Sequence, residues 1–269
     1  MPPLLCPVRN CRQPLERAGR SYRCANRHSF DVARSGYVNL LQPQDRKSKS
    51  PGDTAEAVAA RRRFFEGGHV QPLVDAIVRA LPLGAGDALL DVECGEGHHL
   101  EAFRAAYGVE GWGVDISVPA IELAAKKYRQ CGWVVANADR FLPFADGAFA
   151  AVTSITARMN PEEFRRVLAP GGALLVVLPG ADDLIELREA VLGEGVERDR
   201  VERTRAAFAP LFTLERHETL RHTAALGREA MHDVMASSYR GLRTRERERL
   251  ENLQPMQVTL ARDLLLFRM

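Results

Sequence analysis

A glycine-rich turn, LLDVECGEGHH, is the feature that most constrains how this chain can fold. The apolar run 88–92 predicts a strand and the run 98–107 a helix, so the turn joins a strand to a helix. Gly95 and Gly97 let the backbone there approach a ligand closely, as nucleotide-binding folds require. Asp115 ends the next predicted strand, about 20 residues on, where its carboxylate can accept hydrogen bonds from ribose hydroxyls. The turn therefore predicts an α/β fold that holds a nucleotide-like cofactor.

Short strand-like runs alternate with helical runs after this turn, which favours a parallel sheet with crossover helices. In order, we predict strands at 111–115, 133–138, 149–155 and 173–179 and helices at 119–128 and 161–169, with a break at Pro170-Gly171-Gly172. Further helices are predicted near 183–193, 199–208 and 228–242. The extended runs 212–226 and 257–269 suit an antiparallel hairpin at the sheet edge. The expected fold is a Rossmann-like sheet of seven strands.

The length and composition allow two units at most. With 269 residues, 46% of them hydrophobic and 27% charged, the chain can form one large core and a small appendage. We predict a metal-held module at 1–41, a linker and two helices at 42–86, and a catalytic α/β domain at 87–269. The longest apolar runs, such as 173–179, are far shorter than the ~20 residues of a membrane-spanning helix, and the first residues lack a secretory signal. We therefore expect a cytoplasmic protein with no membrane contact and with reduced cysteines.

Three of the five cysteines lie close together near the N-terminus, and a histidine follows them. Cys6, Cys11, Cys24 and His28 supply three thiolates and an imidazole, a complete tetrahedral set for structural zinc. Each pair alone is weak evidence because its spacing is looser than in common zinc knuckles, but the foursome predicts a zinc-ribbon-like domain. Buried cysteines without a metal are the alternative. With zinc as its ordering force, the module is expected to have a core separate from that of the α/β domain.

A dinucleotide fold would normally show three glycines in this turn, but Glu93 stands at the first of these positions. The sequence Asp91-Val-Glu-Cys-Gly-Glu-Gly resembles instead the cofactor loop of class I methyltransferases. Leu-Pro-Phe at 142–144 and Pro-Gly-Gly at 170–172 resemble the same family. The resemblance implies that S-adenosylmethionine binds at this turn, and the cofactor-binding candidates there are Asp91, Glu93, Cys94, Gly95, Gly97, Asp115 and Ile116. The Glu93 carboxylate can attract the positively charged cofactor or obstruct its binding. A turn with no ligand is the alternative.

Ordered short segments in the N-terminal third resemble one particular family. They are RHSFDVAR at 27–34, GYVNLL at 36–41, GDTAE at 52–56, ARR at 60–62 and GH at 68–69. Together they resemble the bacterial RlmA family of 23S ribosomal RNA (guanine-N1)-methyltransferases, and the resemblance runs over essentially the whole chain. It implies methyl transfer to N1 of a guanine in a ribosomal RNA hairpin, with the zinc module helping to recognise RNA. It also adds Val70 and Asp183 as cofactor-binding candidates, at positions where the family has a tyrosine and a histidine.

On the substrate side the chain departs from this family. Thr156-Ala157-Arg158 stand where the family usually has an aromatic-Ala-Pro segment, which should lie near the target base. Guanine N1 carries a proton that some group must accept as the methyl arrives. Glu162 and Asp183 are candidates, but each can equally be a carboxylate at a helix N-terminus, so no catalytic residue is assigned.

The distribution of charge bears on the choice of partner. Residues 1–69 contain 13 Lys and Arg against 6 Asp and Glu, so this N-terminal part is basic while the rest is acidic. Basic side chains would contact phosphates, and Tyr22, Phe30, Tyr37 and Asn39 can contact unpaired bases or form the small core of the module. Two alternatives stay open: a non-catalytic zinc- and RNA-binding protein on a degenerate methyltransferase fold, and a methyltransferase acting on a small molecule or a protein. Whether the chain forms a homodimer is also left open.

Overall fold

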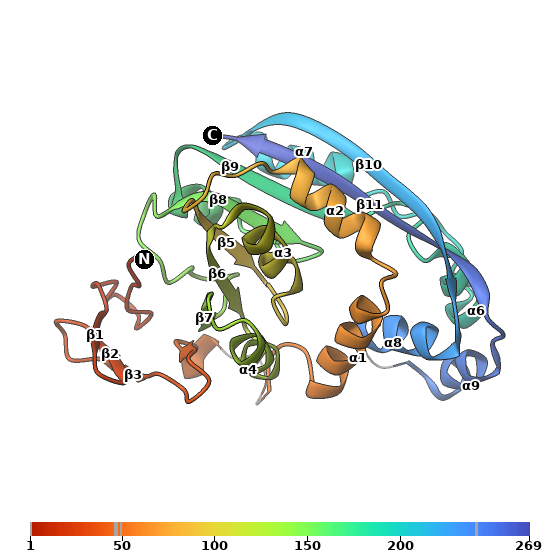
Figure 1. Cartoon of the computed structure of the whole chain (residues 1–269), viewed down its shortest axis with the longest axis horizontal. Coiled ribbons are helices and arrows are strands. Elements are labelled where there is room, and N and C mark those ends of the chain that lie inside the picture. The colour runs from red at the N-terminus through yellow and green to blue at the C-terminus, as the bar shows by residue number, and fades with distance from the viewer. Residues whose placement is uncertain (1, 46–47, 49, 240–241) are drawn as a thin grey trace.

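A mixed β-sheet runs through the centre of the computed structural model (Figure 1). The structure describes residues 2–45, 48, 50–239 and 242–269, and within them eight strands make up this sheet. In their order across the sheet they are β10 (Thr213–Leu226), β11 (Met256–Arg268), β9 (Leu168–Pro179), β8 (Phe149–Ile155), β5 (Ala88–Val92), β6 (Glu110–Asp115), β7 (Gly132–Val135) and β4 (Val38–Asn39). β11 is antiparallel to both of its neighbours, and the pairs from β9 to β4 are parallel. The predicted Rossmann-like α/β fold is confirmed.

Most elements of the α/β domain form where the residue pattern predicts them. β5, β8 and α3 (His98–Tyr107) begin and end at the predicted residues, α4 (Val118–Lys127) is shifted by one residue at both ends, and β6 begins one residue earlier than predicted. β7 stops at Val135 rather than at residue 138, because residues 136–139 leave the sheet and line a cavity. β9 already begins at Leu168 and continues through the Pro-Gly-Gly segment, where its pairing with β8 is irregular.

Alternate residues of the central strands point to opposite faces of the sheet, and both faces are covered. On one face, Leu89 and Leu175 share an apolar cluster with α2 (Gln71–Ala80), α3 and α4. On the other face, Leu90 and Leu174 share a cluster with α5 (Pro161–Val167) and α7 (Val201–Phe208). The sheet is therefore the middle one of three layers.

A long antiparallel hairpin of β10 and β11 closes one edge of the sheet, as predicted. At the end of the hairpin where α8 (Arg228–Ser238) and α9 (Thr244–Asn252) connect its two strands, these helices, α1 (Ala55–Glu66) and α6 (Ile185–Leu192) build a third apolar cluster (Figure 1). α8 ends at Ser238, and residues 240–241 of the helix predicted to reach 242 lie outside the described residues. In the described part of the chain no helix is long and apolar enough to cross a membrane.

The segment between the N-terminal module and the α/β domain was predicted as a linker followed by helices. A short 3₁₀ turn, η1 (Pro43–Asp45), lies in the linker, whose residues 46, 47 and 49 are outside the described residues. α1 begins after Thr54, whose side chain accepts a hydrogen bond of 3.2 Å from the Ala57 N–H and so caps the helix. The two predicted helices are therefore confirmed as α1 and α2.

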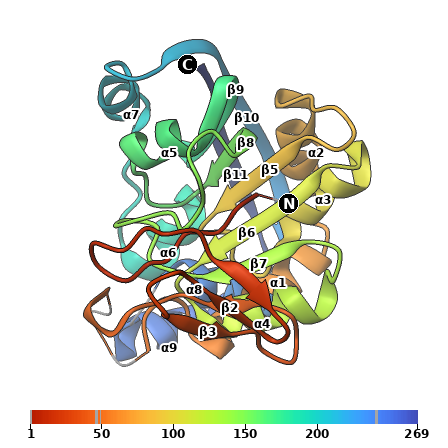
Figure 2. The ribbon, with the colours of Figure 1, turned by 90° about the vertical axis from the view of Figure 1, so that its left-hand side faces the viewer.

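The N-terminal module contains a small antiparallel sheet (Figure 2). It also contributes a strand to the large sheet. The small sheet consists of β1 (Glu16–Ala18), β2 (Ser21–Arg23) and β3 (Ser29–Asp31). Val38 and Asn39, which were assigned to the module, form β4 and pair in parallel with β7. This edge strand brings the described strands of the large sheet to eight instead of the predicted seven. The module boundary at residue 41 stays a prediction.

The module does not have a core of its own, so the expectation of separate cores is wrong. Cys6 and Cys24 belong to the same apolar cluster as Phe144 and Phe149 of the α/β domain. Leu5 extends the contact, since its N–H donates a 3.0 Å hydrogen bond to the carbonyl of Pro143. So short a segment has too few apolar residues to bury a core alone, and it therefore uses the face of the large domain.

Candidate functional site

A cavity of about 610 Å³ opens at the carboxyl ends of β5, β6, β7 and β8. This is the edge where doubly wound α/β sheets bind ligands, and the volume suits a nucleotide-sized molecule. Its lining comes from the four segments that follow these strands, 93–99, 115–116, 136–139 and 155–158, from α1 and from residues just before α1. The elements predicted to flank the glycine-rich turn therefore place it at the centre of a ligand-sized cavity.

The backbone of the glycine-rich turn is left-handed at three positions. Gly95 has a φ of 56° and Gly97 a φ of 81°, and a Cβ atom on Gly97 would lie 2.3 Å from the Trp133 ring. Glycine is therefore required at Gly97 for space as well as for conformation. Glu93 has a φ of 56°, a conformation that costs a non-glycine residue about 1 kcal/mol or more. Such strain is typical of functional sites.

The Glu93 side chain connects two walls of the cavity. One of its carboxylate oxygens accepts a 3.0 Å hydrogen bond from the backbone N–H of Arg158, in the segment that follows β8. Burial raises the pKa of Glu93 to about 7, although the hydrogen bond from Arg158 acts in the opposite direction. A positive charge in the cavity would favour the ionised form of this carboxyl group.

Asp115 holds the turn in place from the end of β6. One carboxylate oxygen accepts a 2.9 Å hydrogen bond from the Gly95 N–H, and the other accepts a 2.7 Å bond from the Ser117 N–H. Burial raises the pKa of Asp115, and these two bonds counteract that effect. Each carboxylate oxygen retains acceptor capacity, so ribose hydroxyls can still donate to Asp115. The residue is suited both to shape the turn and to bind a ribose.

The predicted cofactor residues are only partly brought together. Glu93, Cys94, Gly95, Asp115 and Ile116 line the cavity, as does the departing segment Thr156-Ala157-Arg158. Asp91 lies beneath it in β5, fully buried, where the Thr153 hydroxyl donates to its carboxylate at 2.7 Å and burial raises its pKa to about 7. Gly97 stands behind the turn, against Trp133.

Three predicted residues lie away from the cavity lining. Val70 is buried in the apolar cluster of α1, α6 and α8. Asp183 forms an ion pair with Arg262 and accepts a 3.0 Å hydrogen bond from the Ala261 N–H. Glu162 lines a separate, shallow surface pocket beside Arg165 and Arg166. These positions do not bring Asp183 or Glu162 to the place where a proton acceptor would be needed.

Sequence reasoning missed several residues of the cavity wall. Phe65 and His98 are in ring contact, with centroids 4.8 Å apart, and Phe65 also meets His99 edge-on at 5.5 Å. Burial lowers the pKa of His99 to about 3, so this ring is neutral. Arg61 reaches the cavity from α1. The resemblance marked residues 60–62 as a family segment, but nothing in the pattern showed that an α1 side chain would meet the turn.

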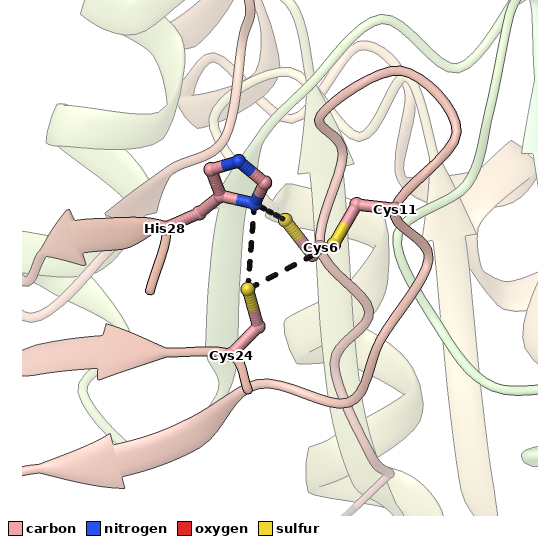
Figure 3. Close-up of side chains that lie close together, drawn as sticks. All are labelled: Cys6, Cys11, Cys24 and His28. Atoms are coloured by element: carbon pink, nitrogen blue, oxygen red, sulfur yellow. Dashed lines mark hydrogen bonds between the residues drawn. The ribbon is translucent and has the colours of Figure 1, made fainter. Parts of the chain in front are cut away.

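The predicted zinc ligands converge on one point (Figure 3). Their four ligand atoms all lie within 4.8 Å of one another, and these atoms belong to Cys6, Cys11, Cys24 and His28. The His28 Nδ1 atom is 3.4 Å from the Sγ atoms of Cys6 and Cys24, and the Cys11 and Cys24 Sγ atoms are 3.8 Å apart. A tetrahedral zinc ion with ordinary bond lengths would separate nitrogen from sulfur by about 3.6 Å and two sulfurs by about 3.8 Å. The donor set and its spacing therefore fit zinc.

Two turns supply these ligands. Cys24 and His28 flank the turn between β2 and β3, where the Cys24 N–H donates to the His28 carbonyl at 3.1 Å. Cys6 and Cys11 come from the loop before β1. The Asn26 side chain donates a 3.2 Å hydrogen bond to the Cys11 sulfur, which supports a thiolate there.

Comparison with known proteins identifies similar sequences for both parts of the chain. Residues 4–49 match the zinc-ribbon family model described as RlmA, N-terminal, and residues 89–172 match the methyltransferase domain model. The chain is 42% identical to the 23S rRNA (guanine(748)-N(1))-methyltransferase of Streptomyces fradiae, over 87% of this chain and 83% of the relative. It is 36% identical to YxjB of Bacillus subtilis (strain 168), named as a candidate 23S rRNA (guanine-N(1)-)-methyltransferase, over 84% of this chain and 82% of that protein.

Solved structures share the fold at low sequence identity. YcgJ from Bacillus subtilis has a TM-score of 0.55 at 18% identity, covering 72% of this chain and 97% of that protein. Phosphoethanolamine N-methyltransferase 2 of Haemonchus contortus, solved with S-adenosyl-L-methionine, has a TM-score of 0.50 at 15% identity, covering 79% of this chain and 57% of that protein. The predicted class I methyltransferase fold is confirmed.

Proposed function

The chain belongs to the RlmA family of 23S ribosomal RNA (guanine-N1)-methyltransferases, and we propose that it methylates N1 of a guanine in a hairpin of 23S ribosomal RNA. One observation carries this proposal. A cofactor-sized cavity at the glycine-rich turn and a Cys3His cluster occur together in a chain that is 42% identical to a guanine-N1 enzyme over most of both lengths. A degenerate fold without activity would not need to keep both.

The cavity residues suit S-adenosylmethionine, which when bound supplies an electrophilic methyl group. We assign Asp115, at the end of β6, as the acceptor of hydrogen bonds from the ribose, and its contact with the Gly95 N–H beside the cavity supports this assignment. The carboxyl groups of Glu93, Glu96, Asp53 and Asp139 also line the cavity, so its lining is rich in acidic groups and favours a positively charged ligand. Of the two roles open to Glu93 from sequence, attraction of the cofactor is the one we propose.

The target base would enter beside the segment that follows β8. Thr156, Ala157 and Arg158 line the cavity there, and the Arg158 side chain donates a 2.9 Å hydrogen bond to Asp139. Thr156 has a φ of 53°, which is rare for a β-branched residue and holds this segment in a specific shape. Because Glu162 and Asp183 lie elsewhere, the acceptor of the guanine N1 proton is to be sought among Glu93, Asp139 and solvent.

The N-terminal module offers a basic surface for the RNA. Its arginines at 9, 12, 17, 20, 23, 27 and 34 are exposed, so their charges are accessible to phosphates. Tyr22 and Phe30 are half-buried against the shared core, which leaves part of each ring for contact with a base. The hairpin form of the substrate and a cytoplasmic location stay predictions, and whether the chain forms a homodimer stays open.

The test is methyl transfer from tritiated S-adenosylmethionine to a transcribed 23S ribosomal RNA hairpin. Replacing Arg17, Arg20 and Arg23 together with glutamine should reduce transfer to the hairpin strongly and leave cofactor affinity unchanged. Equal transfer by this variant and the wild type would remove the module from RNA recognition. Transfer of the label to small molecules or protein, but not to RNA, would favour a methyltransferase that acts on a small molecule or a protein. A complete lack of cofactor binding would favour a non-catalytic zinc- and RNA-binding protein.

A further inference from the structure

Arg61 extends from α1 over the glycine-rich turn. Its Nη2 atom donates to the Asp53 carboxylate at 2.6 Å and to the Ser237 carbonyl at 3.2 Å, so the guanidinium is held from two sides. Its Nη1 atom lies 3.4 Å from the place where a Cβ atom on Gly95 would stand. The guanidinium is therefore held close to a residue of the turn, and Arg61 and Gly95 both line the cavity.

Glu96, between the two glycines of this turn, is a buried acidic residue. Its exposed fraction is only 4%, and its Oε1 atom has no hydrogen-bond partner among the described residues. The Nε2 atom of His99, which also lines the cavity, is likewise buried without a partner in that part of the chain. A buried polar group without a partner destabilises the fold, and folded proteins keep few of them without a reason. A ligand that enters the cavity would supply the missing partner.

The opposite charges of Arg61 and Glu96 act on the same region. The positive charge of Arg61 opposes the rise that burial causes in the Glu96 pKa, which places the two groups within electrostatic reach of each other. Both line the cavity, Arg61 with its Nη1 atom 3.4 Å from the place of a Cβ atom on Gly95 and Glu96 as the next residue of the turn. A ligand group that carries a carboxylate and an ammonium a few bonds apart would match this pair, because each end would meet the opposite charge.

We propose that Arg61 and Glu96 form the subsite for the amino-acid end of the cofactor, with Arg61 binding the carboxylate and Glu96 accepting hydrogen bonds from the ammonium group. The inference rests on the proposed use of S-adenosylmethionine and assigns two residues that sequence reasoning did not. Arg61 also links this subsite to Asp53 and Ser237, so binding at the turn is connected to α1 and to the end of α8.

Calorimetric binding of three ligands to the full chain tests the role of Arg61. S-adenosylmethionine has both charged groups, decarboxylated S-adenosylmethionine lacks the carboxylate, and 5′-methylthioadenosine lacks the whole amino-acid end. Arg61→Gln should weaken S-adenosylmethionine binding by about 10- to 100-fold, the loss of a charge-assisted hydrogen bond, and leave the other two ligands unaffected. Arg62→Gln is the matched control, because Arg62 is the next residue on α1 and pairs with Glu66 outside the cavity lining.

The outcomes separate the subsite from a structural role. If Arg61→Gln bound S-adenosylmethionine as the wild type does, or lost all three ligands equally, Arg61 would not bind the carboxylate and the subsite would be overturned. The subsite would also be overturned if the wild type bound S-adenosylmethionine no more tightly than 5′-methylthioadenosine, because the amino-acid end would then add no affinity. A wild type that bound none of the three ligands would instead overturn the proposed function itself.

Glu96 is tested with a different pair of ligands. Glu96→Gln keeps the shape of the side chain, and it should weaken S-adenosylmethionine and S-adenosylhomocysteine by the same factor of about 10 while leaving 5′-methylthioadenosine unchanged. Glu101→Gln, on the same helix and paired with Arg104, is the control. Loss of S-adenosylmethionine alone would point to the sulfonium charge, and no loss for either ligand would exclude Glu96; both results contradict the proposal.

Discussion

The zinc cluster and the cofactor cavity are organised in opposite ways. All four zinc ligands come from 23 consecutive residues, and two short turns bring them together. The cavity collects side chains from α1, from the glycine-rich turn and from the ends of three further strands. A site made by neighbouring residues is visible in the residue pattern, whereas a site assembled across the fold depends on packing that no local pattern contains. The two regions also share one core, so a change in one of them should have a measurable effect on the other.

The largest effect is expected from removing a zinc ligand. Cys24→Ser should abolish zinc binding, whose free energy in small zinc-dependent folds is about 10 kcal/mol or more, and residues 4–31 should lose protection from hydrogen exchange. Elemental analysis and exchange mass spectrometry measure both. Cys131→Ser is the control, because Cys131 is a buried cysteine outside the cluster.

Because the module and the α/β domain share a core, the loss of zinc in Cys24→Ser should also affect the cofactor cavity. Leu5 pairs with Pro143, shortly after the cavity-lining residues 136–139, so the zinc-free variant should also bind S-adenosylmethionine more weakly. Unchanged cofactor affinity in a zinc-free protein would restore the picture of two independent units.

Asp115→Ala should give the next largest effect. Asp115 accepts hydrogen bonds from Gly95 and Ser117 in addition to its proposed ribose contact, so its loss should weaken cofactor binding by about 1.5 to 3 kcal/mol or somewhat more. Calorimetry on the folded variant measures this. An affinity equal to that of the wild type would refute the assignment of Asp115 to the ribose.

A smaller effect than that of Asp115→Ala is expected from pH on the preference for S-adenosylmethionine over S-adenosylhomocysteine. Burial raises the pKa values of Glu93 and Asp91 to about 7, so these groups are neutral below that pH and become negative above it. The ratio of the affinity for S-adenosylmethionine to that for S-adenosylhomocysteine should therefore rise between about pH 6 and pH 8. If the sulfonium charge lowers the pKa of one carboxyl group by one unit, the ratio rises about tenfold, which is about 1.4 kcal/mol. A ratio that stayed constant or fell would show that the carboxylates do not sense the sulfonium charge.

Glu93→Gly should have the smallest effects, and they should be opposite in sign: the fold becomes more stable and cofactor binding becomes weaker. Glycine adopts the left-handed conformation at this position without strain, so the free energy of unfolding should rise by about 1 kcal/mol. Binding of S-adenosylmethionine should weaken modestly because a negative charge is removed. Thermal denaturation and calorimetry measure the two quantities. Tighter binding by the glycine variant would mean that Glu93 obstructs the cavity.

The sequence predicted the order of the elements well because each strand and helix has its own periodicity. The turn with Gly95 and Gly97 and the zinc ligands were predictable for the same reason, since each is local. The role of Arg61 was not, because it depends on where α1 packs, and that of Glu96 was not, because its burial appears only in the folded chain. β4 was missed as a sheet strand because two residues, Val38 and Asn39, are too few to show a period. The shared core of the module was missed because the partner surface, around Phe144, is distant in sequence.

Identification of the methylated nucleoside is the most direct test of the central claim. The purified zinc-bound chain would be incubated with S-adenosylmethionine and an unmodified 23S ribosomal RNA transcript, and the RNA would be digested to nucleosides for mass spectrometry. The account predicts 1-methylguanosine, together with a stop in reverse transcription at one guanine of a hairpin, because a methyl group on N1 blocks base pairing. Methylation at another atom or base, or cofactor binding with no methyl group transferred to this RNA, would contradict it.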